Sequence, residues 1–154
     1  MKARALLAVL LASLGCRDPA KGVMRVQIAA GGAIDATPAT FRVELDDAQR
    51  ARLAGPGPVR LRIAGMELPA GQGALFRLFV DRSDATAGTA AEGDSFAGQV
   101  SLLGQPAGAR YDSLLQLKPP VAARLARARE PGLTLVPVGA VRVSFRELEL
   151  IIGD

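Results

Sequence analysis

The sequence predicts an all-β protein, mainly an antiparallel β-sandwich with one short helix near residues 120–129, after an N-terminal signal peptide. Three observations support this fold class. Many short runs rich in Val, Ile, Leu and Phe are separated by turns rich in Gly and Pro. Several runs alternate apolar and polar residues, as a strand with one buried face does. A single clear helical stretch interrupts them, which is typical of a sandwich rather than of an α/β fold.

The expected strands follow one another along the chain. They are residues 23–28, 41–45, 59–63, 75–80, 96–103, 113–117, 133–138, 141–145 and 148–152. In 41–45 and 59–63 the apolar side chains point to one side and Arg or Glu to the other, which predicts one covered face. The run 75–80 is almost continuously apolar, as in a strand covered on both faces. A long loop over 81–95, rich in small and acidic residues, follows it.

Two segments predict helical structure. Asp46 is the expected N-cap of a helical turn that reaches Leu53. A pair of prolines at 119–120 begins the clearer helix, over 121–129, because proline is tolerated in a first turn. We expect Gly132 to end this helix.

The beginning of the chain predicts a bacterial lipoprotein leader. A basic start and an apolar run over 5–14 precede Cys16, the only cysteine. The run is too short to span a bilayer as a helix and fits a secretory signal. Gly15 fits the cleavage site of a lipoprotein, whereas the Ser-Leu pair at 13–14 departs from the usual Leu followed by a small residue.

The predicted organisation is a signal peptide over 1–15, a lipidated tether over 16–22 and one β-sandwich domain over 23–154. We expect acylated Cys16 to anchor the protein to a membrane of the bacterial cell envelope. The outer membrane is favoured, because Asp18 stands one place later than the Asp of an inner-membrane retention signal. The alternative is an ordinary signal peptide cut nearby, which leaves Cys16 as an unpaired thiol.

Histidine is absent from the whole sequence, and this decides more about function than any motif. It excludes His-based acid–base catalysis, Ser–His triads and His-ligated copper, zinc or iron. Arginines are scattered and aromatic residues are few, which argues against a nucleic-acid groove with stacking platforms. The sequence therefore predicts a protein that is not an enzyme, holds no cofactor and binds no nucleic acid.

Carboxylates provide the remaining candidate sites. Four acids of the long loop could bind a hard cation such as calcium, although their spacing does not match an EF-hand and a solvated loop is the simpler interpretation. These acids are Asp81, Asp84, Glu92 and Asp94. Glu147 and Glu149 share one face of the last strand, where paired carboxylates could act as a glycosidase does. A solvated strand edge is the simpler interpretation of that pair too.

Serines, glycines and arginines provide weaker candidates. Ser95, Ser101 and Ser144 have no base to activate them, and the Gly-Gln-Gly at 71–73 lacks the helix that follows a phosphate loop. Six arginines occupy outward positions and could form a basic face toward lipid headgroups or an acidic partner, or could be an ordinary solvated surface. They are Arg42, Arg60, Arg62, Arg77, Arg142 and Arg146.

Three segments in order carry a further pattern. They read LFRLFVD at 75–81, SFAGQVSL at 95–102, and LTLVP at 133–137 leading into VRVSF at 141–145. Together they resemble the C-terminal domain of plant polyphenol oxidases and related bacterial tyrosinase-like proteins. That domain carries a Lys-Phe-Asp-Val-Phe-like strand, a Phe-Ala-Gly strand and a Thr-Leu-Val-Pro strand in the same order. The resemblance covers about the second half of the chain.

The sequence also departs from that family. Leu75 and Arg77 stand where the family has Lys and Asp, and the Pro-His after the Phe-Ala-Gly strand is missing. In the family, this sandwich packs over a dicopper catalytic domain whose six histidines bind the metal. The resemblance therefore implies an accessory or shield module for a separate tyrosinase-like copper protein. The alternative is an envelope lipoprotein with a structural or binding role unrelated to copper.

Overall fold

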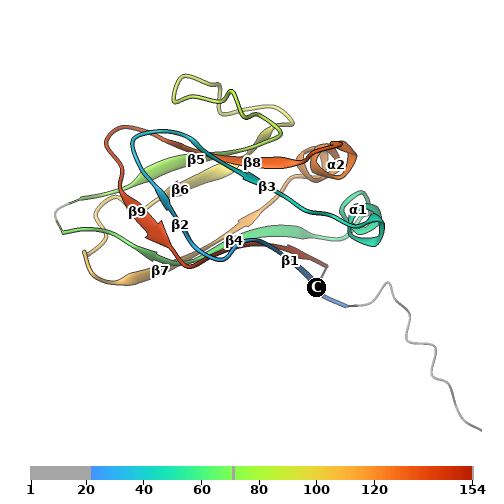
Figure 1. Cartoon of the computed structure of the whole chain (residues 1–154), viewed down its shortest axis with the longest axis horizontal. Coiled ribbons are helices and arrows are strands. Elements are labelled where there is room, and N and C mark those ends of the chain that lie inside the picture. The colour runs from blue at the N-terminus through green and yellow to red at the C-terminus, as the bar shows by residue number, and fades with distance from the viewer. Residues whose placement is uncertain (1–21, 71, 154) are drawn as a thin grey trace, which may run out of the picture.

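Two antiparallel sheets face each other in the computed structural model, which describes residues 22–70 and 72–153 (Figure 1). Sheet A contains β1 (Met24–Ala29), β2 (Gly32–Ile34), β4 (Val59–Glu67), β7 (Arg110–Gln116), β9 (Val143–Phe145) and β10 (Glu147–Ile152). Sheet B contains β3 (Ala39–Arg42), β5 (Leu75–Val80), β6 (Phe96–Ser101) and β8 (Gly132–Pro137), in the order β3-β8-β5-β6. The all-β sandwich predicted from the alternating runs is confirmed.

The six strands of sheet A form only four rows. β10 and β9 lie one after the other along the same edge of β4, and the amide of Arg146 between them donates to the carbonyl of Ala64 at 2.9 Å. β1 and β2 pair with β10 and β9 in the same way, while β7 takes the other edge of β4. Both sheets are therefore four rows wide.

The core lies between the sheets and consists of aliphatic and phenylalanine side chains. Its largest fully buried members include Ile34, Leu53, Leu61, Ile63, Met66, Phe76, Leu78, Leu125, Leu135, Leu148 and Leu150. Leu61 and Ile63 alternate with Arg60 and Arg62 along β4, as the period of two requires.

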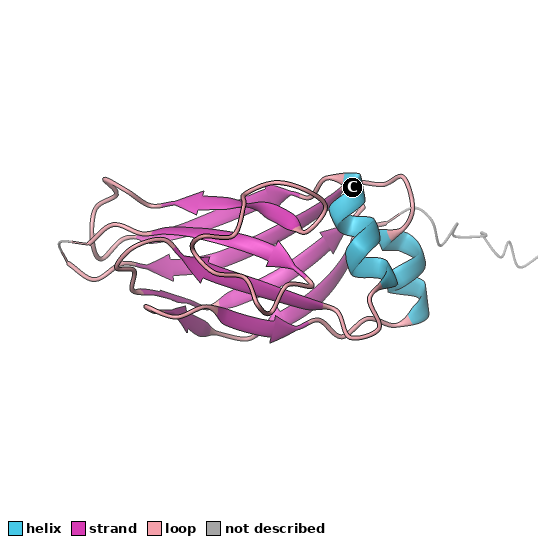
Figure 2. Ribbon diagram, turned by 90° about the horizontal axis from the view of Figure 1, so that it is seen from above, coloured by secondary structure: helices cyan, strands magenta, loops and turns pink. Residues whose placement is uncertain are grey.

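Both helices, α1 (Asp47–Leu53) and α2 (Pro119–Arg127), lie at one end of the sandwich, and loops form the other end (Figure 2). Asp46 caps α1 as predicted: its carboxylate accepts from the Gln49 amide at 2.7 Å, and the Gln49 side chain accepts from the Asp46 amide at 2.9 Å. Arg50 of α1 then donates to two carbonyls at the end of α2, those of Ala126 and Ala128. These two hydrogen bonds join the helices and satisfy carbonyls at the C-terminal end of α2.

Several boundaries differ from the sequence prediction. There are two helices in the described chain rather than one, since the turn after Asp46 is a full α1. α2 ends at Arg127, before Gly132, because the ring of Pro131 would meet the carbonyl four residues earlier.

Strand boundaries shift as well. The strand expected at 41–45 is β3 at Ala39–Arg42, and Val43 instead donates to the carbonyl of Pro131. The short β2 was not predicted, because three residues are too few to show a period.

Most residues of the loop over 81–95 are exposed, as expected of a solvated loop, but the loop folds back over the outer face of sheet B and buries Ala85 there. Ala85 is only 2% exposed and packs with Phe79 and Val136, against which Phe96 also lies. Arg77 donates to the carbonyl of Ala87 at 3.1 Å and holds the segment from the sheet side. The prediction that β5 is covered on both faces is therefore confirmed.

Candidate functional site

Cys16, the residue expected to carry the lipid anchor, lies outside the described residues. The described chain begins at Gly22, and the carbonyl of Gly22 accepts a hydrogen bond from Arg52 of α1. The chain thus enters the sandwich at the helix end (Figure 1). Within the residues described, no helix has the length and apolar character needed to cross a membrane.

The four acids proposed for a cation do not converge. Asp84 pairs with Arg82 at 2.8 Å, whereas Asp94 and Asp81 lie 3.0 and 3.8 Å from Arg124 of α2. Arg124 therefore ties both ends of the 81–95 segment to the helix. Across the described ranges, no three potential metal ligands among Cys, Asp and Glu lie together.

Glu149 is in the middle of sheet A rather than at a solvated edge, which corrects the interpretation of the Glu147–Glu149 pair. β10 lies between β1 and β4, and Glu149 is 4% exposed. One oxygen of Glu149 accepts from Arg25 at 2.7 Å and from Arg62 at 3.0 Å. Glu147 lies 3.3 Å from Arg62 as well. Two guanidinium groups thus cover these carboxylates, which argues against a glycosidase pair.

Asp112 of β7 extends this charge network. It lies 2.8 Å from Arg62, and its second oxygen accepts from the amide of Gly65 at 2.9 Å. The backbone hydrogen bond from Gly65, and then Arg62, hold the pKa of Asp112 below its ordinary value. Arg110 similarly lowers the pKa of Glu67 through a hydrogen bond at 2.6 Å. Acids and bases alternate across the outer face of sheet A.

The six outward arginines do not share one face. Arg60 and Arg62 lie on sheet A, Arg77 lies on sheet B, and Arg142 lies 3.6 Å from Asp35 in the loop end. Arg42 is on sheet B and Arg146 lies between β9 and β10. A continuous basic face is therefore not formed by these residues, because pairing with acids and the division between sheets disperse them.

A shallow depression of about 330 Å³ lies on the outer face of sheet A, beside the point of chain entry. Its lining residues are Val23, Arg25, Arg60, Arg62, Asp112, Ser113, Leu114 and Ile151. Leu114, which is 56% exposed, is its most prominent apolar side chain.

The loop end has a different composition. Four loops form it: 35–38, 68–74, 102–109 and 138–142 (Figures 1 and 2). Among the described residues of these loops only Asp35 and Arg142 are charged, and they lie near each other. The two helix-end segments, 43–58 and 117–131, contain ten charged residues. They are Glu44, Asp46, Asp47, Arg50, Arg52, Lys118, Arg124, Arg127, Arg129 and Glu130.

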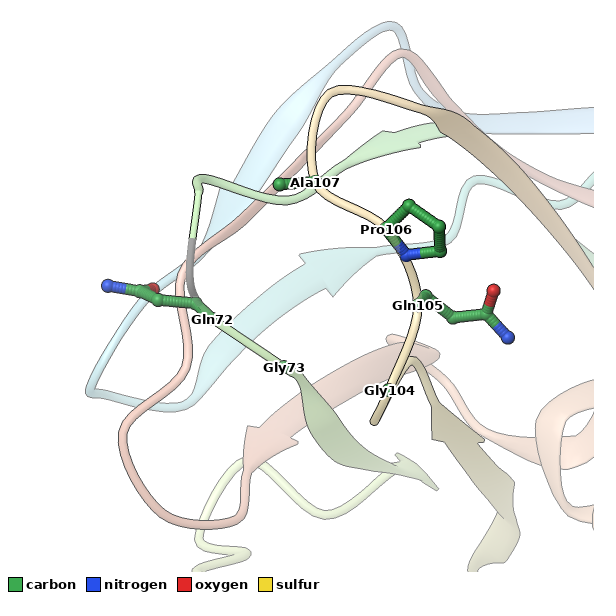
Figure 3. Close-up of a pocket in the computed structure, with 6 residues that line it drawn as sticks. All are labelled: Gln72, Gly73, Gly104, Gln105, Pro106 and Ala107. Carbon is green, nitrogen blue, oxygen red and sulfur yellow. The ribbon is translucent and has the colours of Figure 1, made fainter.

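A hollow of about 370 Å³ separates two of these loops. Gln72 and Gly73 line one side, and Gly104, Gln105, Pro106 and Ala107 line the other (Figure 3). The amide groups of Gln72 and Gln105 point away from each other in this view, so backbone and small side chains form the walls.

The loop over 102–109 is held in place from several directions. The Tyr111 hydroxyl donates to the carbonyl of Pro106 at 2.6 Å. The amide of Leu102 donates to the carbonyl of Ala74 at 2.7 Å. Leu103 lies against Gly73, where an added Cβ would stand 2.9 Å from a Leu103 methyl group. Leu103 is nevertheless 60% exposed. The loop therefore presents a large apolar side chain to solvent from a fixed position.

The described surface offers polar and apolar contacts rather than activated nucleophiles. Ser95 is buried, whereas Ser101 and Ser144 are exposed, and the sequence has no histidine that could activate them. All six aromatic rings in the sequence are buried or half-buried, including Tyr111. The fold defines an all-β sandwich domain.

Comparison with solved structures shows that this sandwich is similar in fold to part of the plant polyphenol oxidases. A latent aurone synthase (polyphenol oxidase) matches with a TM-score of 0.56 and 14% identity, over 83% of this chain and 28% of the other. A latent apple tyrosinase matches with a TM-score of 0.56 and 16% identity, over 80% of this chain and 27% of the other. The chain thus spans about a quarter of these enzymes. At such identity the likeness establishes the fold.

A xylan-binding module, CBM15, has the same fold over its whole length. It matches with a TM-score of 0.55 and 10% identity, over 85% of this chain and 96% of the other. No protein-family model matches the sequence. No curated protein matches it in sequence either.

The sequence did not indicate the network around Glu149, because the register that brings Arg25 and Arg62 to it comes from distant strands. The low charge of the loop end, by contrast, could have been predicted from the sequence. The segments 68–74 and 102–109 contain no charged residue in a chain of which 22% is charged.

Proposed function

We propose that this chain is a non-catalytic accessory domain that covers or escorts a separate tyrosinase-like copper protein in the bacterial cell envelope. The observation that carries the proposal is the match of about four fifths of the chain to about a quarter of two latent polyphenol oxidases. The order of the three sequence segments at 75–81, 95–102 and 133–145 supports the same assignment.

The side chains present support a role without catalysis. The chain has no histidine, so it cannot supply the imidazole ligands of a dicopper site. In the described part of the chain, its carboxylates are divided among arginines rather than gathered around a cavity. A partner would supply the copper, and this domain would act through its surface.

Affinity capture of proteins that bind this chain in the cell envelope tests whether it has a copper-protein partner. The full chain with a C-terminal affinity tag is expressed in its own host, extracted in mild detergent and purified. We expect a dicopper protein to be retained, with phenol oxidase activity that rises when this domain is removed by protease. Retention of no copper protein would refute the proposal.

We further propose that acylated Cys16 anchors the domain. The apolar run over 5–14 followed by Cys16 supports this, and the helix end, where the described chain begins, would lie nearest the membrane. Cys16→Ser should move the protein from the membrane to the soluble fraction, while Ser13→Ala should leave it in place. Membrane association of Cys16→Ser would contradict the anchor.

A binding role unrelated to copper is the second candidate, and the match to nearly all of a xylan-binding module favours it. Binding through stacked sugar rings would use exposed aromatic side chains, and here all six are at least half-buried. Titration with xylan oligosaccharides monitored by calorimetry distinguishes the two candidates. Saturable heat would support the second.

A further inference from the structure

We propose that the outer face of sheet A, at the side nearest the chain entry, lies against a bilayer and binds anionic lipid headgroups. This surface, the entry face, surrounds the shallow depression of about 330 Å³ on sheet A. It comprises Val23, Arg25, Arg60, Arg62, Leu114 and Ile151. The inference rests on the lipid anchor proposed above and adds which side of the domain faces the membrane.

Exposed apolar side chains are concentrated at the entry face. Within the described ranges, three large apolar side chains are strongly exposed: Val23 at 48%, Leu114 at 56% and Leu103 at 60%. Val23 and Leu114 line the same depression, although one precedes β1 and the other is on β7. A single exposed leucine is ordinary on a soluble domain, whereas two apolar side chains around one depression with a polar rim are typical of an interaction surface.

The positive charge of sheet A increases toward the chain entry. Strand register places Arg25 of β1 and Arg60 of β4 in one row on either side of β10, and this row contains no acid. Glu147 and Asp112 lie farther along the sheet, toward the loop end, and both contact Arg62. The row nearest the entry therefore complements the negative charge of anionic headgroups.

Arg25 keeps hydrogen-bonding capacity for a ligand. Its Nη1 donates to Glu149 at 2.7 Å, and its side chain is still 59% exposed. A guanidinium has five N–H donors, so the bond to Glu149 leaves others that can reach a phosphate oxygen. The aliphatic stem of an arginine can lie on apolar surface while its charged group stays among the headgroups.

The position of the chain entry brings this surface to the membrane. Val23 directly follows Gly22, the first residue described, and Cys16 precedes Gly22 by six residues. Six residues span at most roughly 20 Å when fully extended. An anchor at Cys16 would therefore hold the entry face within that distance of the bilayer, whereas Leu103 lies at the opposite, loop end.

Single-tryptophan variants test this orientation, because the sequence contains no tryptophan. Leu114→Trp places the probe on the entry face, and Leu103→Trp places it at the loop end as a control of similar exposure. Each full-length lipidated variant is reconstituted in vesicles of phosphatidylethanolamine and phosphatidylglycerol, with or without brominated acyl chains that quench tryptophan on contact. We expect bromination to lower the fluorescence of Leu114→Trp about twofold or more and that of Leu103→Trp by less than about a tenth.

The same assay tests the headgroup. Replacing phosphatidylglycerol with phosphatidylcholine should reduce the quenching of Leu114→Trp by about half or more, since the attraction to the arginines is lost. Adding Arg25→Gln to Leu114→Trp should act in the same direction, whereas Arg42→Gln on sheet B should have no effect. Equal quenching in both lipids would overturn the assignment to anionic headgroups.

The other outcomes separate this inference from the anchor. Quenching of Leu103→Trp alone, of both variants or of neither, in protein bound to vesicles, would overturn the entry face and leave the anchor intact. A wild-type chain that does not associate with vesicles would refute the anchor and this inference together. A dimer in detergent that already buries the probe of Leu114→Trp would assign the surface to a second copy instead.

A second measurement needs no substitution in the entry face. Hydroxyl-radical footprinting compares the wild-type chain on vesicles with Cys16→Ser in solution. We expect vesicles to lower the labelling of Val23 and Leu114 about threefold or more and to leave that of Leu103 unchanged. Equal labelling of all three residues in the two samples would overturn the inference.

Discussion

The outer faces of the two sheets are protected in different ways. On sheet B, the segment 81–95 packs Ala85 on Phe79 of β5 and Val136 of β8, so these two strands bury apolar side chains on their outer side as well. On sheet A, β4 alternates, and Arg25 and Arg62 lie over Glu149 instead. An apolar outer face needs a chain segment to cover it, whereas an alternating face can remain at the surface when its charges are paired.

The largest expected effect comes from the covered face. Phe79→Ala should lower the free energy of unfolding by about 3 kcal/mol, because it empties the centre of the apolar cluster beneath the 81–95 segment. Urea denaturation of the soluble domain measures it. The control Leu114→Ala on sheet A should cost less than about 1 kcal/mol. Equal losses would mean that the covering segment contributes no packing energy.

The second effect concerns the charged face. Glu149→Ala should lower the free energy of unfolding by about 1–2 kcal/mol, because two arginines lose the carboxylate they share. Glu149→Met keeps most of the volume and should cost less, since a buried ion pair is often replaceable by an apolar side chain. Urea denaturation compares the two. A larger loss in Glu149→Met than in Glu149→Ala would contradict the interpretation.

A smaller, local effect should follow Arg77→Ala. Arg77 holds the covering segment by hydrogen bonds to the carbonyls of Ala87 and Thr89, so its removal should speed amide hydrogen exchange in residues 85–89 severalfold. The global free energy of unfolding should change by less than about 1 kcal/mol. Arg82→Ala is the control, because the Arg82 side chain donates to Asp84 within the segment itself. Unchanged exchange in Arg77→Ala would show that apolar packing alone holds the cover.

The smallest effect is a pH dependence on sheet A. The pKa of Asp112 is lower in the folded protein than its ordinary value, so its contribution to stability is fully present above about pH 4 and is lost as the pH falls through the folded pKa. Asp112→Asn should lower stability by a constant amount from pH 5 to 8 and should make its decline between about pH 4 and pH 2 shallower, because the wild-type protein loses the contribution of Asp112 in that range. Thermal unfolding of both proteins from pH 2 to 8 measures this, and a decline below pH 4 as steep in Asp112→Asn as in the wild type would contradict the assignment.

Sequence patterns predicted most of the elements because each depends on neighbours along the chain. The alternation in 59–63, the continuous apolar run of 75–80 and the Asp46 cap were all confirmed. Sequence patterns did not predict the features that depend on contacts between residues far apart in the chain. They did not indicate β2, which exists by pairing with β9, nor the cover provided by 81–95.

The candidate sites divide in the same way. Composition alone removed histidine chemistry, since no fold can supply a missing imidazole. The tertiary structure decided what the acids do: strand register places Glu149 under Arg25 and Arg62, and Arg124 draws Asp81 and Asp94 toward α2.

By itself, then, the sequence determined the sandwich, its inner face and the chemistry that is absent, because these follow from residue types and their period. Only the tertiary structure decided which outer face is covered, that Glu149 is central, and that four loops with few charged residues meet at one end, where Leu103 is exposed. The physical reason is that these features join residues far apart in the chain, and their proximity depends on strand order and register.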